Sequence, residues 1–445
     1  MDRYDAIVVG MGPGGEVAAS RLLAAGKRVA VVERELIGGE CGYWACIPSK
    51  TLLRPVEARA AAGRVPGLDA PALDWALALA YRDVMIRHLD DGRQVAGYQK
   101  QGAIVLKGAA RFTGPRTVEV DGRSLQADHV IVATGSQAAV PPIEGLAEVG
   151  YWTNREATGL SEIPRRALLV GGSAVGVELG QFLARMGARV TIVQRGPSLM
   201  DREDPRVGEL IRGVLEADGI DVRTGRTATR ARRDGGEAVV TLDDGEQIHT
   251  DVIVLGAGRR PRLDGLGLEA AGIIPESGGL PVDSLAGEGI WAVGDVTPAP
   301  KFTHVAKYQA RVVADAILGK PRRTSYLGIP RVVFSDPEVA AAGMTADQAR
   351  AQGMDVITAE VSLPDALARP WTYETEPRGH LGLVADRRDG VLVGAWAVAP
   401  LAGEFIHQAA QAIRARIPLA TLLDGVAQFP TYSEGYLAAL ERLEP

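Results

Sequence analysis

The chain has 445 residues, 46% of them hydrophobic, and a formal net charge of -6 at pH 7. It is long and apolar enough for several hydrophobic cores, and we expect three or four α/β domains. The mild acidity excludes the basic stripe that nucleic acids and anionic membranes require. With a first strand from Tyr4 and no apolar run of membrane-spanning length, we expect a cytoplasmic protein without a leader peptide.

The first predicted elements are a strand over residues 4–9, a glycine-rich turn and a helix that ends near Ala25. The turn reads Gly10-Met11-Gly12-Pro13-Gly14-Gly15. In this GxGxxG spacing, the first glycine permits a tight turn, the second lets the backbone approach a pyrophosphate, and the last allows close packing of the helix. A second strand, residues 29–32, is followed by Glu33, whose carboxylate can accept hydrogen bonds from a ribose diol. Together these features predict a dinucleotide site.

The only two cysteines of the chain, Cys41 and Cys46, come next. A regular helix would separate them by about 7.5 Å along its axis, whereas a disulfide needs Cα atoms about 4.4–6.8 Å apart. We therefore expect a distorted helix entry, for which Gly38, Gly39 and Gly42 supply the backbone freedom. Since thiolates near a helix N-terminus are stabilised by its dipole, the pair predicts a redox-active disulfide. The alternative is two unrelated buried thiols.

A second copy of the nucleotide-binding pattern follows. It comprises a strand over residues 167–170, the turn Gly171-Gly172-Ser173-Ala174-Val175-Gly176, a helix and a strand over residues 190–193. Ser173 replaces the middle glycine, and the second strand ends in Gln194 and Arg195 where the first copy has an acid. With Gln194 in place of an acid, no carboxylate repels the 2′-phosphate of NADPH, and the Arg195 guanidinium can bind that phosphate. Both features favour NADPH over NADH. Arg202 is either a second phosphate ligand or a solvated loop charge.

Further motifs complete an ordered series along the chain. They are Ala133-Thr134-Gly135, Gly258-Arg259-Arg260-Pro261, Ala292-Val293-Gly294-Asp295, Val305-Ala306 and a segment over residues 329–337. With the two glycine turns and the Cys-x4-Cys-x3-Lys segment, this series resembles the class I pyridine nucleotide-disulfide oxidoreductases. That family includes dihydrolipoamide dehydrogenase, glutathione reductase and mercuric reductase, and the resemblance covers nearly the whole chain.

The resemblance implies an α/β fold with two Rossmann-like dinucleotide-binding domains and a C-terminal α+β dimerisation domain. It also implies the cofactors FAD and NADPH, with NADH as a second donor, and a homodimer. The expected boundaries are 1–150 for the FAD-binding domain, 151–264 for the NAD(P)-binding domain, 265–324 for a central domain that completes the FAD site, and 325–445 for the interface domain. Residues 56–100 are expected to form alanine-rich helices inserted in the first domain.

The same resemblance assigns roles to single residues. Cys46 matches the thiolate that contacts the flavin, and Cys41 matches the exchange thiol that faces the acceptor. Lys50 matches a lysine near the flavin N5 that stabilises negative charge, and Glu178 matches its ion-pair partner. No metal site is expected. The implied cofactor-binding residues are Gly10, Gly12, Gly14, Gly15, Glu33, Ala110, Thr134, Gly135, Asp295, Val305, Gly171, Ser173, Gly176, Gln194, Arg195 and Gly258.

One departure from the family pattern concerns acid–base chemistry. Disulfide-reducing members end in a His-Pro-Thr-x-x-Glu segment, but Phe429 stands where the histidine would be, and a phenyl ring transfers no proton. Glu434 is a catalytic candidate, although a role at a helix terminus is favoured. Tyr432, with an ordinary pKa near 10, is a poor base at neutral pH. His304 is the only histidine whose position indicates proximity to the flavin, with either a proton-transfer or a structural role.

A second departure lies between the cysteines, where Tyr43 and Trp44 either pack on the flavin or fill the core. The leading hypothesis is an enzyme that passes two electrons from NADPH through FAD and the Cys41–Cys46 disulfide to a disulfide or another small acceptor. One alternative is direct reduction of a quinone or dye. Another is metal-ion reduction of the mercuric type, although the chain has no second cysteine pair. The last is a flavoprotein scaffold without catalysis.

Overall fold

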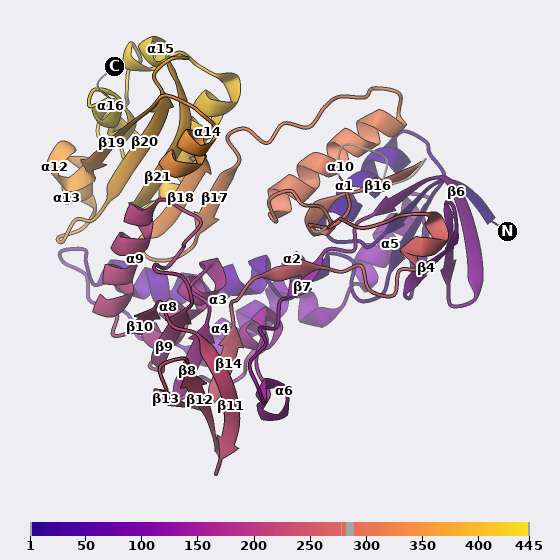
Figure 1. Cartoon of the computed structure of the whole chain (residues 1–445), viewed down its shortest axis with the longest axis horizontal. Coiled ribbons are helices and arrows are strands. Elements are labelled where there is room, and N and C mark those ends of the chain that lie inside the picture. Colours follow the sequence, from indigo (N-terminus) through magenta and orange to yellow (C-terminus); the bar gives the residue numbers. More distant parts are fainter. Residues whose placement is uncertain (1, 277, 282–288, 444–445) are drawn as a thin grey trace. The chain divides into compact units, whose positions relative to one another are not determined.

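Strands and helices alternate along the chain in a computed structural model that describes residues 2–276, 278–281 and 289–443 (Figure 1). The chain divides into two units, each of which is described by itself. The first unit contains Met1–Thr51, Leu79–Ala139 and Gly258–Ser325. The second unit contains Leu52–Ala78, Val140–Ala257 and Tyr326–Pro445. The predicted division into four domains stays a prediction.

The first unit is built on a seven-stranded sheet with the strand order β3-β2-β1-β6-β5-β4, in which β16 also pairs with β6. Its strands are β1 (Asp2–Val9), β2 (Val29–Glu33), β3 (Ile104–Lys107), β4 (Ala110–Gly114), β5 (Thr117–Val120), β6 (Arg123–Val132) and β16 (Ile290–Ala292). The pairs of β1 with β2 and β6, of β2 with β3 and of β16 with β6 are parallel. The continuous apolar runs of β1 and β2 suit a sheet that is covered on both faces.

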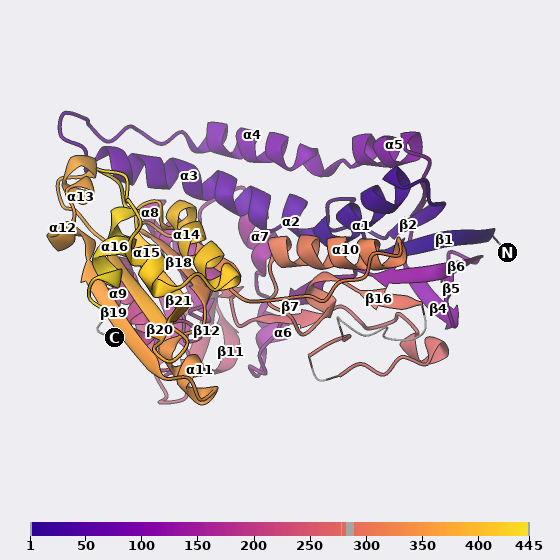
Figure 2. The ribbon, with the colours of Figure 1, turned by 90° about the horizontal axis from the view of Figure 1, so that it is seen from above.

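Two helices cover one face of this sheet, α1 (Pro13–Ala24) and α10 (Thr303–Ile317). Figures 1 and 2 show them side by side. Their contact is built from small side chains, including Ala18, Ala19 and Ala310, which let the two helix backbones approach closely. This packing places the N-terminus of α10 beside the first glycine turn. Both lie next to the segment that carries the cysteines.

The remaining elements lie wholly or partly in the sequence ranges of the first unit. They are α2 (Gly39–Tyr43), α3 (Cys46–Ala62), α4 (Trp75–Met85), η1 (Arg87–Leu89), α5 (Gly92–Lys100), β7 (Ser136–Ala138), β15 (Arg259–Pro261), η2 (Leu268–Ala271) and η3 (Gly294–Val296). Strands β7 and β15 form a separate antiparallel pair. The expected helices over residues 56–100 are confirmed as the end of α3, α4 and α5.

The second unit repeats the strand, helix, strand pattern on a parallel four-stranded sheet with the order β10-β9-β8-β14. A three-stranded antiparallel sheet, β11-β12-β13, accompanies it. The elements are α6 (Leu146–Val149), α7 (Asn154–Gly159), β8 (Arg166–Val170), α8 (Ala174–Arg185), β9 (Arg189–Gln194), α9 (Pro205–Ala217), β10 (Asp221–Thr224), β11 (Ala228–Asp234), β12 (Glu237–Leu242), β13 (Gln247–Thr250) and β14 (Val252–Leu255).

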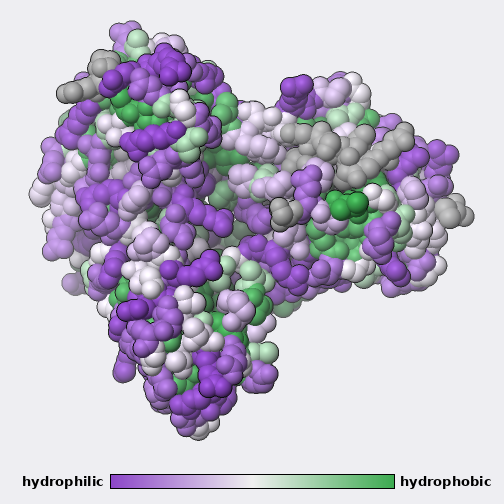
Figure 3. Space-filling model, in the orientation of Figure 1, coloured by the Kyte–Doolittle hydropathy of each residue, from purple (hydrophilic) through white to green (hydrophobic). Residues whose placement is uncertain are grey.

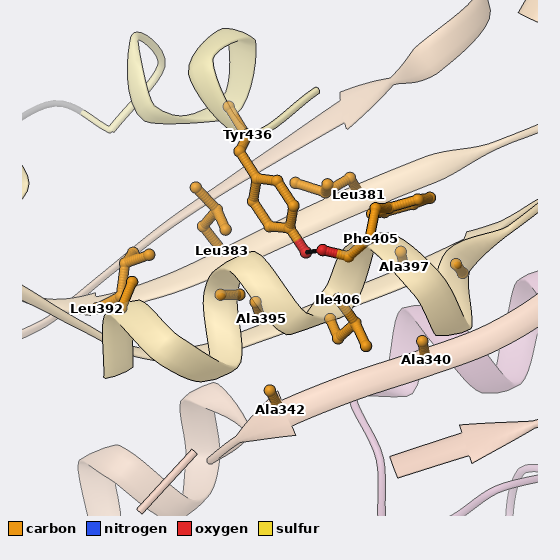
Figure 4. Close-up of a cluster of buried hydrophobic side chains, with 14 of the residues drawn as sticks. Ala340, Ala342, Leu381, Leu383, Leu392, Ala395, Ala397, Phe405, Ile406 and Tyr436 are labelled. Atoms are coloured by element: carbon orange, nitrogen blue, oxygen red, sulfur yellow. Dashed lines mark hydrogen bonds between the residues drawn. The ribbon is translucent and has the colours of Figure 1, made fainter. Parts of the chain in front are cut away.

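The C-terminal part of the second unit is a five-stranded antiparallel sheet, β17-β18-β21-β20-β19, with helices on it. Its elements are β17 (Pro330–Val333), β18 (Glu338–Gly343), α11 (Ala346–Ala351), β19 (Val356–Ser362), α12 (Leu363–Ala366), α13 (Arg369–Tyr373), β20 (His380–Asp386), β21 (Val391–Ala399), α14 (Ala402–Ala415), α15 (Leu419–Leu423) and α16 (Glu434–Leu440). Figure 4 shows its core, in which the Tyr436 hydroxyl donates to the Phe405 carbonyl oxygen at 3.2 Å. The expected fold class is confirmed.

Buried charges lie inside the second unit. The Asp336 carboxylate, in a residue that is 7% exposed, accepts hydrogen bonds from Arg64, Arg185 and Arg378. Glu374, 3% exposed, also pairs with Arg64 and Arg378. Burial alone would raise the pKa of Asp336, but Arg378, Arg185 and Arg64 outweigh it and hold that pKa below its usual value. The network joins segments that are far apart in the sequence.

The surface is mostly polar, as the charge content predicts, and Figure 3 shows hydrophilic side chains over most of one face with small apolar areas between them. Among the described residues, no helix combines the length and the hydropathy that crossing a membrane requires.

Candidate active site

The first glycine turn has the shape of a phosphate cradle. Gly10 has φ +95°, and a Cβ there would lie 2.5 Å from the Ala133 carbonyl oxygen, so only glycine fits. A Cβ at Gly15 would lie 2.0 Å from the Gly10 carbonyl oxygen, which shows how closely α1 packs on the turn. At Gly12 the space is open, since the nearest atom to a Cβ would be Gly39 Cα at 4.0 Å. This free space at the uncapped N-terminus of α1 fits a pyrophosphate.

Glu33 ends β2 beside the same turn and is 8% exposed. Its carboxylate accepts the Met11 N–H and the Glu35 N–H, both at 2.7 Å. Burial raises the pKa of Glu33. A carboxylate has about four lone-pair sites, so the two that remain are available to a ribose diol. The residues of the first turn therefore fit the adenosine and pyrophosphate parts of FAD.

The cysteine segment passes directly over this turn. The Gly38 N–H donates to the Met11 carbonyl oxygen at 2.8 Å, and a Cβ on Gly39 would lie 2.7 Å from Gly12 Cα. Cys41 lies in the short helix α2, whereas Cys46 is the first residue of α3. The break between the two helices confirms the distorted entry that the spacing predicts.

The two cysteines are free thiols that share a hydrogen bond, and this bond moves their pKa values in opposite directions. It raises the pKa of Cys41, which burial raises further. It lowers the pKa of Cys46 to about 6, with help from Thr303 and from the charge of Lys50, while burial opposes the shift. The shared hydrogen bond therefore favours the thiolate form of Cys46 and the thiol form of Cys41.

Thr303 is a third member of this group that sequence reasoning missed. It is the first residue of α10, and its hydroxyl donates to the Cys41 sulfur at 3.3 Å. The same hydroxyl oxygen lies 3.5 Å from the Cys46 sulfur. The available signal was its place directly before His304 and Val305, the family segment that contacts the flavin.

We expect Thr303→Val to raise the pKa of the Cys46 thiol, because the substitution removes a hydroxyl that lowers it. The shift should be about one pKa unit, equivalent to about 1.4 kcal/mol. It can be measured as the pH midpoint of thiolate absorbance in reduced protein. Thr303→Ser keeps the hydroxyl and serves as the control. An unchanged midpoint in Thr303→Val would contradict the role of this hydrogen bond.

Other predicted site residues of the first unit have the following places. Val305 is 2% exposed and follows Thr303 in α10, and Ala110 begins β4. The Thr134 hydroxyl donates to the Arg262 carbonyl oxygen at 2.7 Å. Asp295 accepts from the Ser136 hydroxyl at 2.5 Å. Three glycines bring no side chain into the site; they are Gly14, Gly135 and Gly258.

Two arginines in and directly after β15, Arg259 and Arg262, had no role in the sequence-based prediction. The Arg259 guanidinium donates to the Ser136 hydroxyl at 2.7 Å and lies 3.9 Å from Asp295. The Arg262 guanidinium donates to the carboxylate of Glu40, the neighbour of Cys41, at 3.3 Å. These contacts connect the β7–β15 pair to the cysteine segment and balance the negative charge of Glu40 and Asp295.

Of the two aromatic residues between the cysteines, Tyr43 is buried and Trp44 is half-buried. Tyr43 is 1% exposed, and its hydroxyl donates to the Ile37 carbonyl oxygen at 3.1 Å. Arg87 lies over its ring at 5.6 Å. Trp44 is half-buried against Tyr43, with ring centroids 5.7 Å apart. Of the two expectations, core filling is therefore the one that applies to Tyr43.

The second glycine turn follows the pattern of the first. Gly171 has φ +112°, and a Cβ at Gly176 would lie 2.0 Å from the Gly171 carbonyl oxygen. Ser173, the N-cap of α8, turns its hydroxyl away from the helix N-terminus and donates to the Gly256 carbonyl oxygen at 2.8 Å. The turn thus keeps a free helix N-terminus for a phosphate despite the missing glycine.

The strand end beside this turn differs from the expectation in one respect. Gln194 accepts the Gly172 N–H at 2.8 Å, as Glu33 accepts its counterpart. Arg195 is exposed, as a phosphate ligand would be. However, the Gln194 amide also donates to the Asp201 carboxylate at 3.0 Å, so a negative charge lies at this strand end after all.

Lys50 and Glu178 belong to different units. Lys50 lies in α3, one turn after Cys46, and its charge lowers the pKa of that thiol. Glu178 is buried in α8, and its carboxylate accepts the Phe334 N–H at 2.9 Å. The predicted ion pair between Lys50 and Glu178 stays a prediction.

The C-terminal segment contributes no evident base. Phe429 is 71% exposed. Glu434, the first residue of α16, accepts the Thr431 N–H at 3.0 Å, which is the contact of a helix-terminus residue. Tyr432 is 4% exposed, its hydroxyl meets no hydrogen-bond partner within the described part of the chain, and burial raises its pKa. His304 is exposed and stacks on the Phe302 ring at 5.2 Å.

Comparison with known proteins decides the family. Residues 4–310 match the family described as pyridine nucleotide-disulphide oxidoreductase, and residues 329–440 match its dimerisation domain. The chain belongs to this family. The pyridine nucleotide-disulphide oxidoreductases are FAD-dependent and use NAD(P)H as electron donor.

Relatives and solved structures agree with this assignment. A dihydrolipoyl dehydrogenase of Thermus scotoductus is 36% identical over 100% of this chain and 98% of its own length. A mercuric reductase of Streptomyces lividans is 36% identical over 93% of this chain and 90% of its own. The HOCl-induced flavoprotein disulfide reductase RclA of Escherichia coli has a TM-score of 0.88 at 26% identity, covering 99% of this chain and 100% of that one. The family carries out pyridine nucleotide-dependent disulfide oxidoreduction.

Proposed function

We propose that the protein passes two electrons from NADPH through FAD and the Cys41–Cys46 pair to a disulfide or another small acceptor. The observation that carries this proposal is the shared hydrogen bond of the two thiols, with the pKa of Cys46 lowered to about 6. Bound FAD supplies the two-electron exchange between the coenzyme and the cysteines. The preference for NADPH rests on Gln194, which is uncharged, and on the exposed guanidinium of Arg195.

With a disulfide acceptor, two successive thiol–disulfide exchange steps transfer the two electrons from the cysteine pair to the acceptor. The Cys41 thiolate attacks one acceptor sulfur, which breaks the acceptor S–S bond, forms a mixed disulfide and releases one thiolate. The Cys46 thiolate then attacks the Cys41 sulfur, releases the second acceptor thiolate and restores the Cys41–Cys46 disulfide. The proton that the Cys41 thiol gives up before it attacks and one proton from water convert the two released thiolates to thiols. The two electrons that NADPH donates through FAD reduce the Cys41–Cys46 disulfide for the next cycle.

The raised pKa of Cys41 restricts the choice of acceptor. Its thiol must lose a proton before it attacks, and Phe429 stands where the family resemblance implies a histidine for this step in disulfide-reducing members. An acceptor whose thiols have low pKa values needs little acid catalysis when they leave. We therefore propose an acceptor disulfide with good leaving thiols. Direct reduction of a quinone at the flavin is the second candidate, because it needs no thiol exchange.

An anaerobic titration tests the electron path. NADPH, and separately NADH, should bleach the flavin and produce the long-wavelength absorbance of a thiolate next to it. A flavin that neither coenzyme reduces would support a scaffold without catalysis. The acceptor class is tested with Cys41→Ser, which should lose disulfide reduction and keep quinone reduction if the quinone receives electrons directly.

Restoring the missing base should increase activity with ordinary disulfides. We expect Phe429→His to raise the rate of lipoamide reduction about 100-fold, since general acid–base catalysis contributes about 10²–10⁴-fold. Phe429→Leu, which keeps an apolar side chain, is the matched control. No gain in folded, FAD-loaded Phe429→His protein would contradict the proposed reason for the acceptor preference.

The remaining assignments accompany this proposal. Lys50 and Glu178 are proposed to stabilise charge near the flavin, and Glu434 to act at the N-terminus of α16. The match to a dimerisation domain supports a homodimer. We propose a location in the cytoplasm, where a disulfide is more often catalytic than structural. The residues that we propose to bind FAD and NADPH are the cofactor-binding residues that the family resemblance implies.

A further inference from the structure

The end of β9 carries an arrangement that the sequence pattern does not indicate. Gln194 is buried and uses both ends of its amide. Its oxygen accepts the Gly172 N–H at 2.8 Å, and its nitrogen donates to Asp201 at 3.0 Å. The amide therefore holds the Asp201 carboxylate at the strand end next to the second glycine turn.

A second contact limits where this carboxylate can lie. A Cβ on Gly196 would be 2.7 Å from the nearer Asp201 carboxylate oxygen and 2.8 Å from the Gln194 amide nitrogen. The absence of a side chain at Gly196 thus makes room for the pair. Asp201 itself is exposed, and the Gln194 amide contacts only one of its two carboxylate oxygens.

The first glycine turn shows what a carboxylate does at this place. There, Glu33 receives the turn N–H directly and keeps lone pairs for a ribose diol. In the second turn the N–H contact and the charge are divided between two residues, with Gln194 taking the contact and Asp201 supplying the charge. An acid at the end of the second strand is the feature that accepts the 2′-hydroxyl of NADH and repels the 2′-phosphate of NADPH.

We propose that Asp201 is a specificity-determining residue that restrains the preference for NADPH and lets the protein accept NADH. The inference rests on the proposed binding of the nicotinamide coenzyme at the second glycine turn. Asp201 acts against the exposed Arg195, since one charge disfavours a 2′-phosphate and the other favours it. The balance of the two sets the discrimination between the coenzymes.

The test uses equilibrium binding to the FAD-loaded protein, which requires no turnover. Adenosine 2′,5′-bisphosphate represents the phosphorylated adenosine half, and 5′-AMP the unphosphorylated one. We expect Asp201→Asn to tighten binding of adenosine 2′,5′-bisphosphate about tenfold while 5′-AMP binds no tighter, measured by titration calorimetry. Raising the salt concentration should reduce this difference, because screening weakens the repulsion between exposed charges.

Asp234→Asn is the matched control, because it removes one exposed carboxylate from the same unit at the far end of β11. It should leave the ratio of the two affinities unchanged. If both ligands bind wild-type protein and Asp201→Asn leaves their ratio unchanged, the role of Asp201 is wrong while the coenzyme site stands. If neither ligand binds wild-type protein, the coenzyme site and the role of Asp201 both fail.

Discussion

Cys46→Ser should lower the rate of NADPH-driven disulfide reduction about a thousandfold or more, as removal of an essential nucleophile does in other enzymes. The serine hydroxyl cannot form the disulfide, and it does not ionise near pH 6 as the Cys46 thiol does. Steady-state rates with a disulfide acceptor provide the measurement. Thr51→Ala, which removes an exposed hydroxyl one turn further along α3, is the control and should keep nearly full activity.

The pH dependence of the same group follows from its lowered pKa. Because the pKa of Cys46 is about 6, the reduced protein should gain thiolate absorbance as the pH rises through 6 and lose it below. Cys46→Ser should lack this absorbance at every pH. A midpoint near the ordinary cysteine value of about 8.5 would show that the contacts of Cys46 with Cys41 and Thr303 do not hold in solution.

Asp336→Ala should destabilise the second unit by about 3–5 kcal/mol, because it leaves buried arginines without their shared partner. The measurement is urea unfolding, followed by a probe in the second unit. Asp389→Ala removes an exposed ion pair with Arg416 and should cost about 0–1 kcal/mol. A loss of the same small size in Asp336→Ala would contradict a stabilising role for the network.

The sign of the pH effect can also be checked for Asp336. Its folded-state pKa lies below the unfolded value, so its contribution to stability is present above about pH 4 and is lost as the pH falls through the folded-state pKa. The difference in stability between wild-type protein and Asp336→Ala should therefore be largest near neutral pH. It should shrink in acid, where the Asp336 carboxylate becomes protonated.

Much of the fold could be predicted because its signals are local. The glycine turns, the apolar strands before them and the break between Cys41 and Cys46 depend on neighbouring residues, whose backbone preferences act over a few positions. The order of these motifs along the chain then identified the family resemblance, which the comparisons confirmed. The absence of a histidine at Phe429 was equally visible in the sequence.

Contacts between distant segments could not be predicted in the same way. Thr303 meets Cys41 across 262 positions of the chain, and Arg64 meets Asp336 across 272. The substitution of Gln194 for an acid indicated a site without a carboxylate, yet a loop returns Asp201 to the same place. No pattern of spacing in one sequence reports which loop side chain will fold back onto a strand end.

The sequence by itself determined the two glycine turns, the close spacing of the two cysteines and the phenylalanine at position 429, since each is read from residue types at short spacings. Only the tertiary structure decided that the Thr303 hydroxyl lies beside both cysteine sulfurs and that Asp201 lies at the end of β9. Both depend on hydrogen bonds and electric fields that act over a few ångströms in space, and side chains brought together by folding create them.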